Sequence, residues 1–122
     1  MPAMKILFLL LAAHYIIDIQ LQNETIARQK NLNAPPPKAY DPAIHGPLEK
    51  CWPYYMACHA FSHGLGVFMA TGGSVYFAFA ETIAHYIIDV GKCSKLYGIH
   101  ADQAMHVITK FVWFFLITQG IW

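Results

Sequence analysis

Charged residues are scarce in this chain of 122 residues. Asp, Glu, Lys and Arg together make up 12% of the sequence, and the formal net charge is +1. A soluble domain usually contains about 25% charged residues. Disordered chains have low hydrophobicity and nucleic-acid-binding domains usually carry a basic excess, so the composition excludes both classes. We therefore expect no nucleic-acid partner.

Cysteine is rare as well. The three cysteines are odd in number and form no CxxC pair. The sequence therefore predicts neither a disulfide framework nor a zinc ribbon.

Apolar residues, in contrast, are abundant. They make up 57% of the chain, and the mean hydropathy is +0.37. A monomer this small would have too few polar residues to cover its surface in water. Four apolar segments of 17–19 residues each lie near the lower length limit for a helix that spans a bilayer: 4–21, 54–71, 74–90 and 104–122.

The connections predict how these segments pack. Gly72 and Gly73 allow a tight turn between the second and third segments, and a short polar stretch, 91–102, joins the third and fourth. The proline-rich segment 31–53 is expected to be a loop, preceded by a short helix near 23–30. Short connections favour antiparallel neighbours. We predict an all-α, single-domain, integral membrane four-helix bundle over residues 1–122.

Lys and Arg residues concentrate in the two polar loops. The positive-inside rule therefore places both loops in the cytoplasm and both ends of the chain outside. A soluble helical bundle is the alternative, and it is disfavoured because none of the four segments has a continuous polar face. Aromatic residues such as Trp113 are expected at the membrane interface or facing lipid.

A hexapeptide is repeated without change in the first and third segments. The sequence AHYIID occupies 13–18 and again 84–89. The second and fourth segments also correspond, because each begins with two polar residues four positions apart. The chain is therefore predicted to contain two helical hairpins related by a pseudo-two-fold axis along the membrane normal.

The repeated residues predict a metal site. Residues four apart share a helix face, and in an alternating bundle all these polar stripes reach the cytoplasmic side. Ionisable groups at membrane depth are costly unless they are paired, hydrated or bound to metal. Imidazoles and carboxylates bind zinc, the expected ion, and also iron or manganese. The candidate ligands are His14, Asp18, His59, His63, His85, Asp89 and His106.

Other polar residues near these stripes have candidate roles in catalysis or substrate binding. Asp102 or Glu81 is a candidate general base. Glu81 is alternatively a metal ligand or the partner of Lys110. Residues expected to hold a substrate phosphate or oxygen are Lys30, Lys92, Gln22 and Gln103. Two further histidines are expected in loops, His45 and His100.

The combined pattern resembles that of the DUF3307 family. The matching residues span 14–106 and are His14-x-x-x-Asp18, Leu21-Gln22, Lys30, His59 with His63, His85-x-x-x-Asp89-x-x-Lys92 and Asp102-Gln103-x-x-His106. The resemblance implies a small multi-pass membrane protein of bacteria or their phages, located in the inner membrane, without an established activity. A looser similarity links the placing of His and Asp to predicted membrane-bound metal-dependent hydrolases. The segment 31–53 lies outside the pattern.

These observations favour a metal-dependent hydrolase acting on a lipid or lipid-linked phosphate, with the bilayer as its environment. Transport of protons or a divalent cation is an alternative, although the outer halves of the helices contain few polar groups. A third hypothesis is a non-catalytic small subunit of a larger membrane complex or homo-oligomer. Small residues on the second segment would permit the close helix contacts that this requires.

Overall fold

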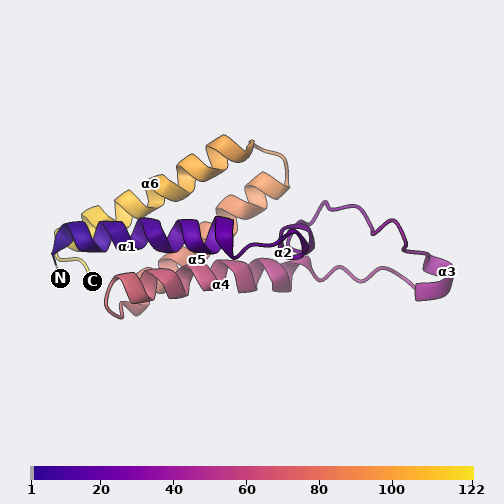
Figure 1. The fold of residues 1–122 in the computed structure, drawn as a ribbon, viewed down its shortest axis with the longest axis horizontal. Coiled ribbons are helices and arrows are strands. Elements are labelled where there is room, and N and C mark those ends of the chain that lie inside the picture. The colour runs from indigo at the N-terminus through magenta and orange to yellow at the C-terminus, as the bar shows by residue number, and fades with distance from the viewer. Residues whose placement is uncertain (1) are drawn as a thin grey trace.

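The computed structural model describes residues 2–122, and these residues form helices and no strand (Figure 1). The all-α class is therefore confirmed. The elements are α1 (Ala3–Tyr15), the π-helical turn η1 (Ile16–Gln20), α2 (Glu24–Gln29), α3 (Pro42–His45), α4 (Trp52–Ala70), α5 (Val75–Cys93) and α6 (Ile99–Thr118).

The four long helices form a bundle with a simple contact pattern. Helix α1 packs against α4 and α6, and α5 packs against the same two helices. Helices α1 and α5 therefore lie at opposite corners, as do α4 and α6. The start of α1 and the end of α6 lie at one end of the bundle, whereas α2 and α3 extend beyond the other end (Figure 1).

The α4–α5 hairpin follows from local sequence. Gly72 and Gly73 have φ of 75° and 108°, a backbone region that favours glycine. Ser74 then caps α5 by accepting a hydrogen bond from the backbone N–H of Phe77. The tight turn expected from the glycine pair is present.

The connection between α5 and α6 is shorter than predicted. Helix α5 continues to Cys93 and α6 begins at Ile99, so Lys92 and Asp102 are helical. The placement of His45 and His100 in loops was wrong, because His45 ends the short helix α3 and His100 lies in the first turn of α6. Polar residues in these end turns gave the stretch a loop-like composition, although it contains no proline.

Tyr97 closes this short connection. Its hydroxyl donates a hydrogen bond to the carbonyl oxygen of Ile88 at 2.5 Å, and its ring lies against Gly91. Burial raises the pKa of Tyr97, so the hydroxyl stays protonated and remains a donor. The contact joins the last turns of α5 to the start of α6.

Apolar and polar side chains are distributed unusually. The apolar core lies toward the end where α1 begins, and it consists of Ile6, Leu10, Val67, Ala70, Phe77 and Ile117. Toward the other end, most buried side chains are histidine, aspartate or lysine. Large apolar side chains on the long helices instead face outward, among them Phe8, Leu65, Phe79, Ile83, Ile108 and Phe115.

By length and composition, one helical stretch within residues 2–122 is apolar enough to cross a membrane, Ala3–Gln20. One such stretch is weak evidence, since buried core helices and signal sequences have similar compositions. The predicted four membrane spans therefore stay a prediction at this point.

Close contact between α4 and α5 depends on Gly64. A Cβ atom added there would lie 2.1 Å from Thr82 Oγ1 and 2.6 Å from the carbonyl oxygen of Ala78. Alanine normally stabilises a helix relative to glycine. We nevertheless expect Gly64→Ala to lower the free energy of unfolding by about 1–3 kcal/mol, because the helices must move apart.

Denaturant unfolding followed by circular dichroism measures this loss. Gly98→Ala is the control for steric contact, since the added Cβ there meets nothing within 4 Å. Gly98 is the N-cap of α6, where alanine is less favourable than glycine, so we expect a loss of at most about 1 kcal/mol. Equal stability of the two variants would contradict the close α4–α5 contact.

Candidate metal centre

Eight buried side chains from all four long helices and η1 meet inside the bundle. We call them the His/Asp cluster. Each is at most 8% exposed. Its members are His14, Asp18, His59, His63, His85, Asp89, Asp102 and His106.

The two copies of the repeated hexapeptide place their aspartates differently. Asp18 lies in the π-helical turn η1, whereas Asp89 lies in regular α-helix. The surroundings therefore determine the local geometry, since the six residues are identical. Wide π-turns within α-helices frequently occur at functional sites. Both carboxylates reach the cluster.

One half of the cluster centres on Asp18. Its Oδ1 atom lies 3.2 Å from His59 Nε2 and 3.5 Å from His63 Nε2. The same oxygen is 3.7 Å from Nε2 of His85. One ligand atom from each of these four residues lies within 4.8 Å of the others, so the four residues could hold one metal ion.

The other half centres on Asp89 and His106. His106 Nε2 lies 3.0 Å from Asp89 Oδ1 and 3.5 Å from Asp102 Oδ1. His85 connects the halves, because its Nε2 is also 3.5 Å from Asp89 Oδ2. The imidazole of His14 lies beside that of His106, with 5.3 Å between ring centroids. Two further metal-compatible groups occur here: His85, Asp89 and His106, and Asp18, Asp102 and His106.

Several buried donor and acceptor atoms in the cluster lack a hydrogen-bond partner among residues 2–122. They include His63 Nε2, His85 Nε2 and Asp102 Oδ1. Leaving such a buried group unsatisfied costs about 1–3 kcal/mol. His63 and His85 also stack with their ring centroids only 3.5 Å apart. A bound cation would give these atoms a partner, so the residues present fit a metal ion.

Two polar side chains, Gln103 and Lys30, lie directly against the carboxylates of the cluster. Gln103 Nε2 donates to Asp18 Oδ2 at 2.6 Å and to Asp102 Oδ2 at 3.2 Å. Lys30, which follows α2, is buried and forms an ion pair with Asp89. These contacts place two of the residues predicted to bind substrate directly at the cluster.

The other two predicted substrate-binding residues lie at its edge. Lys92 Nζ is 3.8 Å from Asp102 Oδ2, and its side chain is 31% exposed. Gln22 lines a groove that also contains His59, and its Oε1 atom is buried without a protein partner in the described part of the chain.

Glu81 lies one helical turn from His85 and has strong partners of its own. Its Oε1 accepts a hydrogen bond from Lys110 Nζ at 2.5 Å, and its Oε2 accepts one from Trp113 Nε1 at 2.7 Å. Oε1 is also 3.7 Å from His85 Nδ1. Of the three roles considered for Glu81, the structure shows the pairing with Lys110.

Sequence reasoning missed the role of Trp113 in this network. Trp113 is a donor to a buried carboxylate, so its indole points inward. It lies three residues after Lys110, on the same helix face. That spacing was the available signal for an inward-facing indole.

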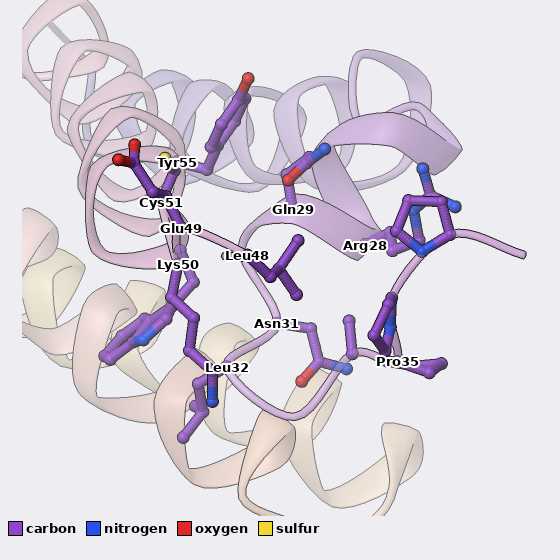
Figure 2. Close-up of a pocket in the computed structure, with 14 residues that line it drawn as sticks. Arg28, Gln29, Asn31, Leu32, Pro35, Leu48, Glu49, Lys50, Cys51 and Tyr55 are labelled. Atoms are coloured by element: carbon purple, nitrogen blue, oxygen red, sulfur yellow. The ribbon is translucent and has the colours of Figure 1, made fainter. Parts of the chain in front are cut away.

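A separate cavity of about 320 Å³ lies between α2, the proline-rich segment and the start of α4 (Figure 2). Leu48 lies between Arg28 and Lys50 in this view, and Tyr55 lies above it. None of the residues that line this cavity belongs to the His/Asp cluster. The proline-rich segment is also joined to the end of α5, because Asn33 Nδ2 donates to the carbonyl oxygen of Cys93 at 2.7 Å.

The repeat identifies the apolar counterparts of Glu81 and Lys110. When the two hexapeptides are aligned, Glu81 of α5 corresponds to Leu10 of α1. When α4 and α6 are aligned on their i, i+4 polar pairs, Lys110 of α6 corresponds to Val67 of α4. Leu10 and Val67 are both buried in the apolar core. The same pair of positions therefore holds an ion pair in one half and an apolar pair in the other.

Replacing the ion pair tests this correspondence. We expect Glu81→Leu or Lys110→Val alone to lower the free energy of unfolding by about 3–5 kcal/mol, because each leaves a buried charge unpaired. The double variant should recover part of that loss, since it reproduces the apolar pair of the other half but leaves Trp113 Nε1 without its acceptor. Unfolding measurements on the parent, the two single variants and the double variant give the coupling free energy between the two positions. Purely additive losses of stability would contradict the pairing.

Comparison of the chain with protein-family models, with curated proteins and with solved structures finds no match. The resemblance to the DUF3307 family therefore stays an expectation. The functional interpretation rests on the geometry of the His/Asp cluster and its surroundings.

Proposed function

We propose that this chain is an integral membrane protein that holds zinc at the His/Asp cluster and hydrolyses a lipid phosphate or a lipid-linked phosphate. The observation that carries the proposal is the buried convergence of imidazoles and carboxylates from all four long helices. Such convergence inside a helix bundle is a recurrent way to bind transition metals.

The outward-facing apolar side chains support a membrane location. In water, exposed residues such as Leu65, Phe79 and Ile83 would be costly in such number, whereas lipid solvates them. Four charged residues of α5 and α6 face the interior, Glu81, Asp89, Asp102 and Lys110. Mean hydropathy along a helix includes both of its faces. The interior charges therefore lower the mean hydropathy of α5 and α6, although their outer surfaces are apolar. The proposed location is a bacterial inner membrane, with the polar loops in the cytoplasm.

The chemistry that a bound zinc ion supplies is activation of a water molecule. Asp102 is the better candidate for accepting the proton of that water, because its Oδ1 is buried and has no hydrogen-bond partner among residues 2–122. Glu81 is a weaker candidate, since both of its oxygens already accept hydrogen bonds. Lys92, partly exposed beside Asp102, is the proposed partner of a phosphate oxygen.

A groove beside the cluster supports a lipid substrate. It has a volume of about 300 Å³, and its apolar walls include Ile17, Leu21 and Ile26. His59 lines the groove and also belongs to the His/Asp cluster. A hydrocarbon chain in the groove would therefore lie next to the metal-binding groups, where its anionic head would meet the cationic centre. Gln22 Oε1 can accept a hydrogen bond from a hydroxyl group of such a head.

The transport alternative is disfavoured by the position of the apolar core. Polar groups continue from the cluster only as far as the Glu81–Lys110 pair among the buried side chains of α5 and α6. Leu10 and Val67 lie beside that pair, and beyond it the interior is filled by Ile6, Phe77 and Ile117. An ion or proton path would need polar groups through this region.

Metal analysis of the purified full chain tests the centre. We expect stoichiometric zinc in the parent and at least a tenfold weaker affinity in His85→Ala, since His85 contacts both Asp18 and Asp89. His45→Ala is the matched control because His45 lies in α3 outside the cluster. A parent protein that binds no metal when zinc is supplied would contradict the proposal.

Blocking the groove tests the lipid substrate. Ser62 is exposed and lines the groove, so Ser62→Trp should fill it while leaving metal binding unchanged. We expect kcat/KM for dodecyl phosphate to fall by about tenfold or more, and that for p-nitrophenyl phosphate to change little.

Leu65→Trp is the control for this experiment. Leu65 is exposed on the same helix and does not line the groove. An equal effect of Ser62→Trp on both substrates would show that the groove does not hold the apolar chain. Absence of hydrolysis of either phosphate by the zinc-loaded parent would count against the hydrolase.

A further inference from the structure

The internal repeat gives the His/Asp cluster an approximate two-fold symmetry. Helix α1 corresponds to α5, so His14 aligns with His85 and Asp18 with Asp89. Helix α4 corresponds to α6, so the pair His59 and His63 aligns with the pair Asp102 and His106. Corresponding helices occupy opposite corners of the bundle. An arrangement found on one side of the cluster should therefore have a counterpart on the other.

The first metal-compatible group contains one residue from each pair of repeat counterparts. Asp18 comes from the first helix of one hairpin, and His59 and His63 come from the second helix of that hairpin. His85 comes from the first helix of the opposite hairpin. Exchanging every residue for its repeat counterpart gives a second group, which consists of Asp89, Asp102, His106 and His14.

The structure gathers this second group around His106. Its Nε2 atom is 3.0 Å from Asp89 Oδ1 and 3.5 Å from Asp102 Oδ1, and the His14 ring lies beside its ring. Each of the two metal-compatible groups on this side contains His106, one of these two aspartates and one residue of the first group, His85 or Asp18. All four side chains are about 1% exposed or less. Asp102 Oδ1 and His14 Nδ1 have no hydrogen-bond partner within residues 2–122, as expected for groups with unused ligand capacity.

We propose that the His/Asp cluster binds two metal ions, one in each of these symmetry-related groups. This inference rests on the proposed metal centre and adds the number of ions and the ligands of each. It makes Asp102 a ligand of the second ion, in place of the proton acceptor considered above. A single zinc ion usually takes four ligands, which would leave half of the eight buried side chains without a cation. Two four-residue groups use all eight.

The carboxylates also connect the two groups. Asp89 lies in the second group, yet its Oδ2 is 3.6 Å from His59 Nε2 in the first. Asp18 lies in the first group and has an oxygen within 4.8 Å of ligand atoms of Asp102 and His106. Carboxylates that reach both groups can bridge two ions, and paired ions about 3.5–4 Å apart stabilise the attacking and leaving oxygens of phosphoryl transfer.

The two groups differ in their donor atoms. The first offers three imidazoles and one carboxylate, whereas the second offers two of each. Imidazole suits zinc, and carboxylate oxygen suits manganese or magnesium better. The first group should therefore prefer zinc more strongly than the second.

Metal titration of the detergent-purified full chain tests the inference. After removal of metal, we expect Mn²⁺ to bind with a stoichiometry of two per chain, and electron paramagnetic resonance to show the spectrum of an exchange-coupled pair. His63→Ala should disable the first group and His106→Ala the second, so each variant should bind one ion with an uncoupled spectrum. His100→Ala is the control, since His100 is exposed on α6, and it should still bind two.

The outcomes separate this inference from the proposed function. One ion in the parent, lost in both variants, would overturn the two-ion arrangement and leave a single metal centre. No ion in the parent would overturn both proposals. If a variant fails to fold, as shown by circular dichroism, the stoichiometry and spectrum of the parent still decide between one ion and two.

Discussion

Burial of eight histidine and aspartate side chains in one small bundle is the constraint on which the rest of the structure depends. Each of these groups loses water on folding, so each needs a partner inside. The partners come from other helices, which fixes the rotation of all four long helices at once: every polar face turns inward. The outer surface is then apolar as a consequence. The interior charges and the apolar exterior are two results of the same helix orientation.

Much of this arrangement could be predicted from the sequence. The two identical hexapeptides and the i, i+4 pairs on the other helices indicated which faces would meet, because helical periodicity is a local property. The same reasoning located the Gly72–Gly73 turn and the short helix after Gln22. It also placed the ends of α4 to within a few residues. Features that depend on residues close together in the chain could therefore be predicted from the sequence.

Features that depend on residues far apart in the chain could not be predicted from the sequence. Identical hexapeptides adopt a π-turn at Asp18 and α-helix at Asp89, so these six residues by themselves contain no signal for the difference. Lys30 crosses from α2 to Asp89, 59 positions away in the chain. His100 lies in the first turn of α6, directly after a connection that Tyr97 closes by a hydrogen bond to Ile88. In each case tertiary contacts decide a geometry that composition leaves open.

The Glu81–Lys110 pair makes the two halves of the molecule non-equivalent. Two copies of the first hairpin would place Leu10 and Val67 at both positions, and two copies of the second would bury two ion pairs. If the halves arose by duplication of one hairpin, the two positions had to change almost together, because an intermediate with one buried charge is strongly unstable. The ion pair thus gives a chain built from two similar hairpins two distinguishable sides.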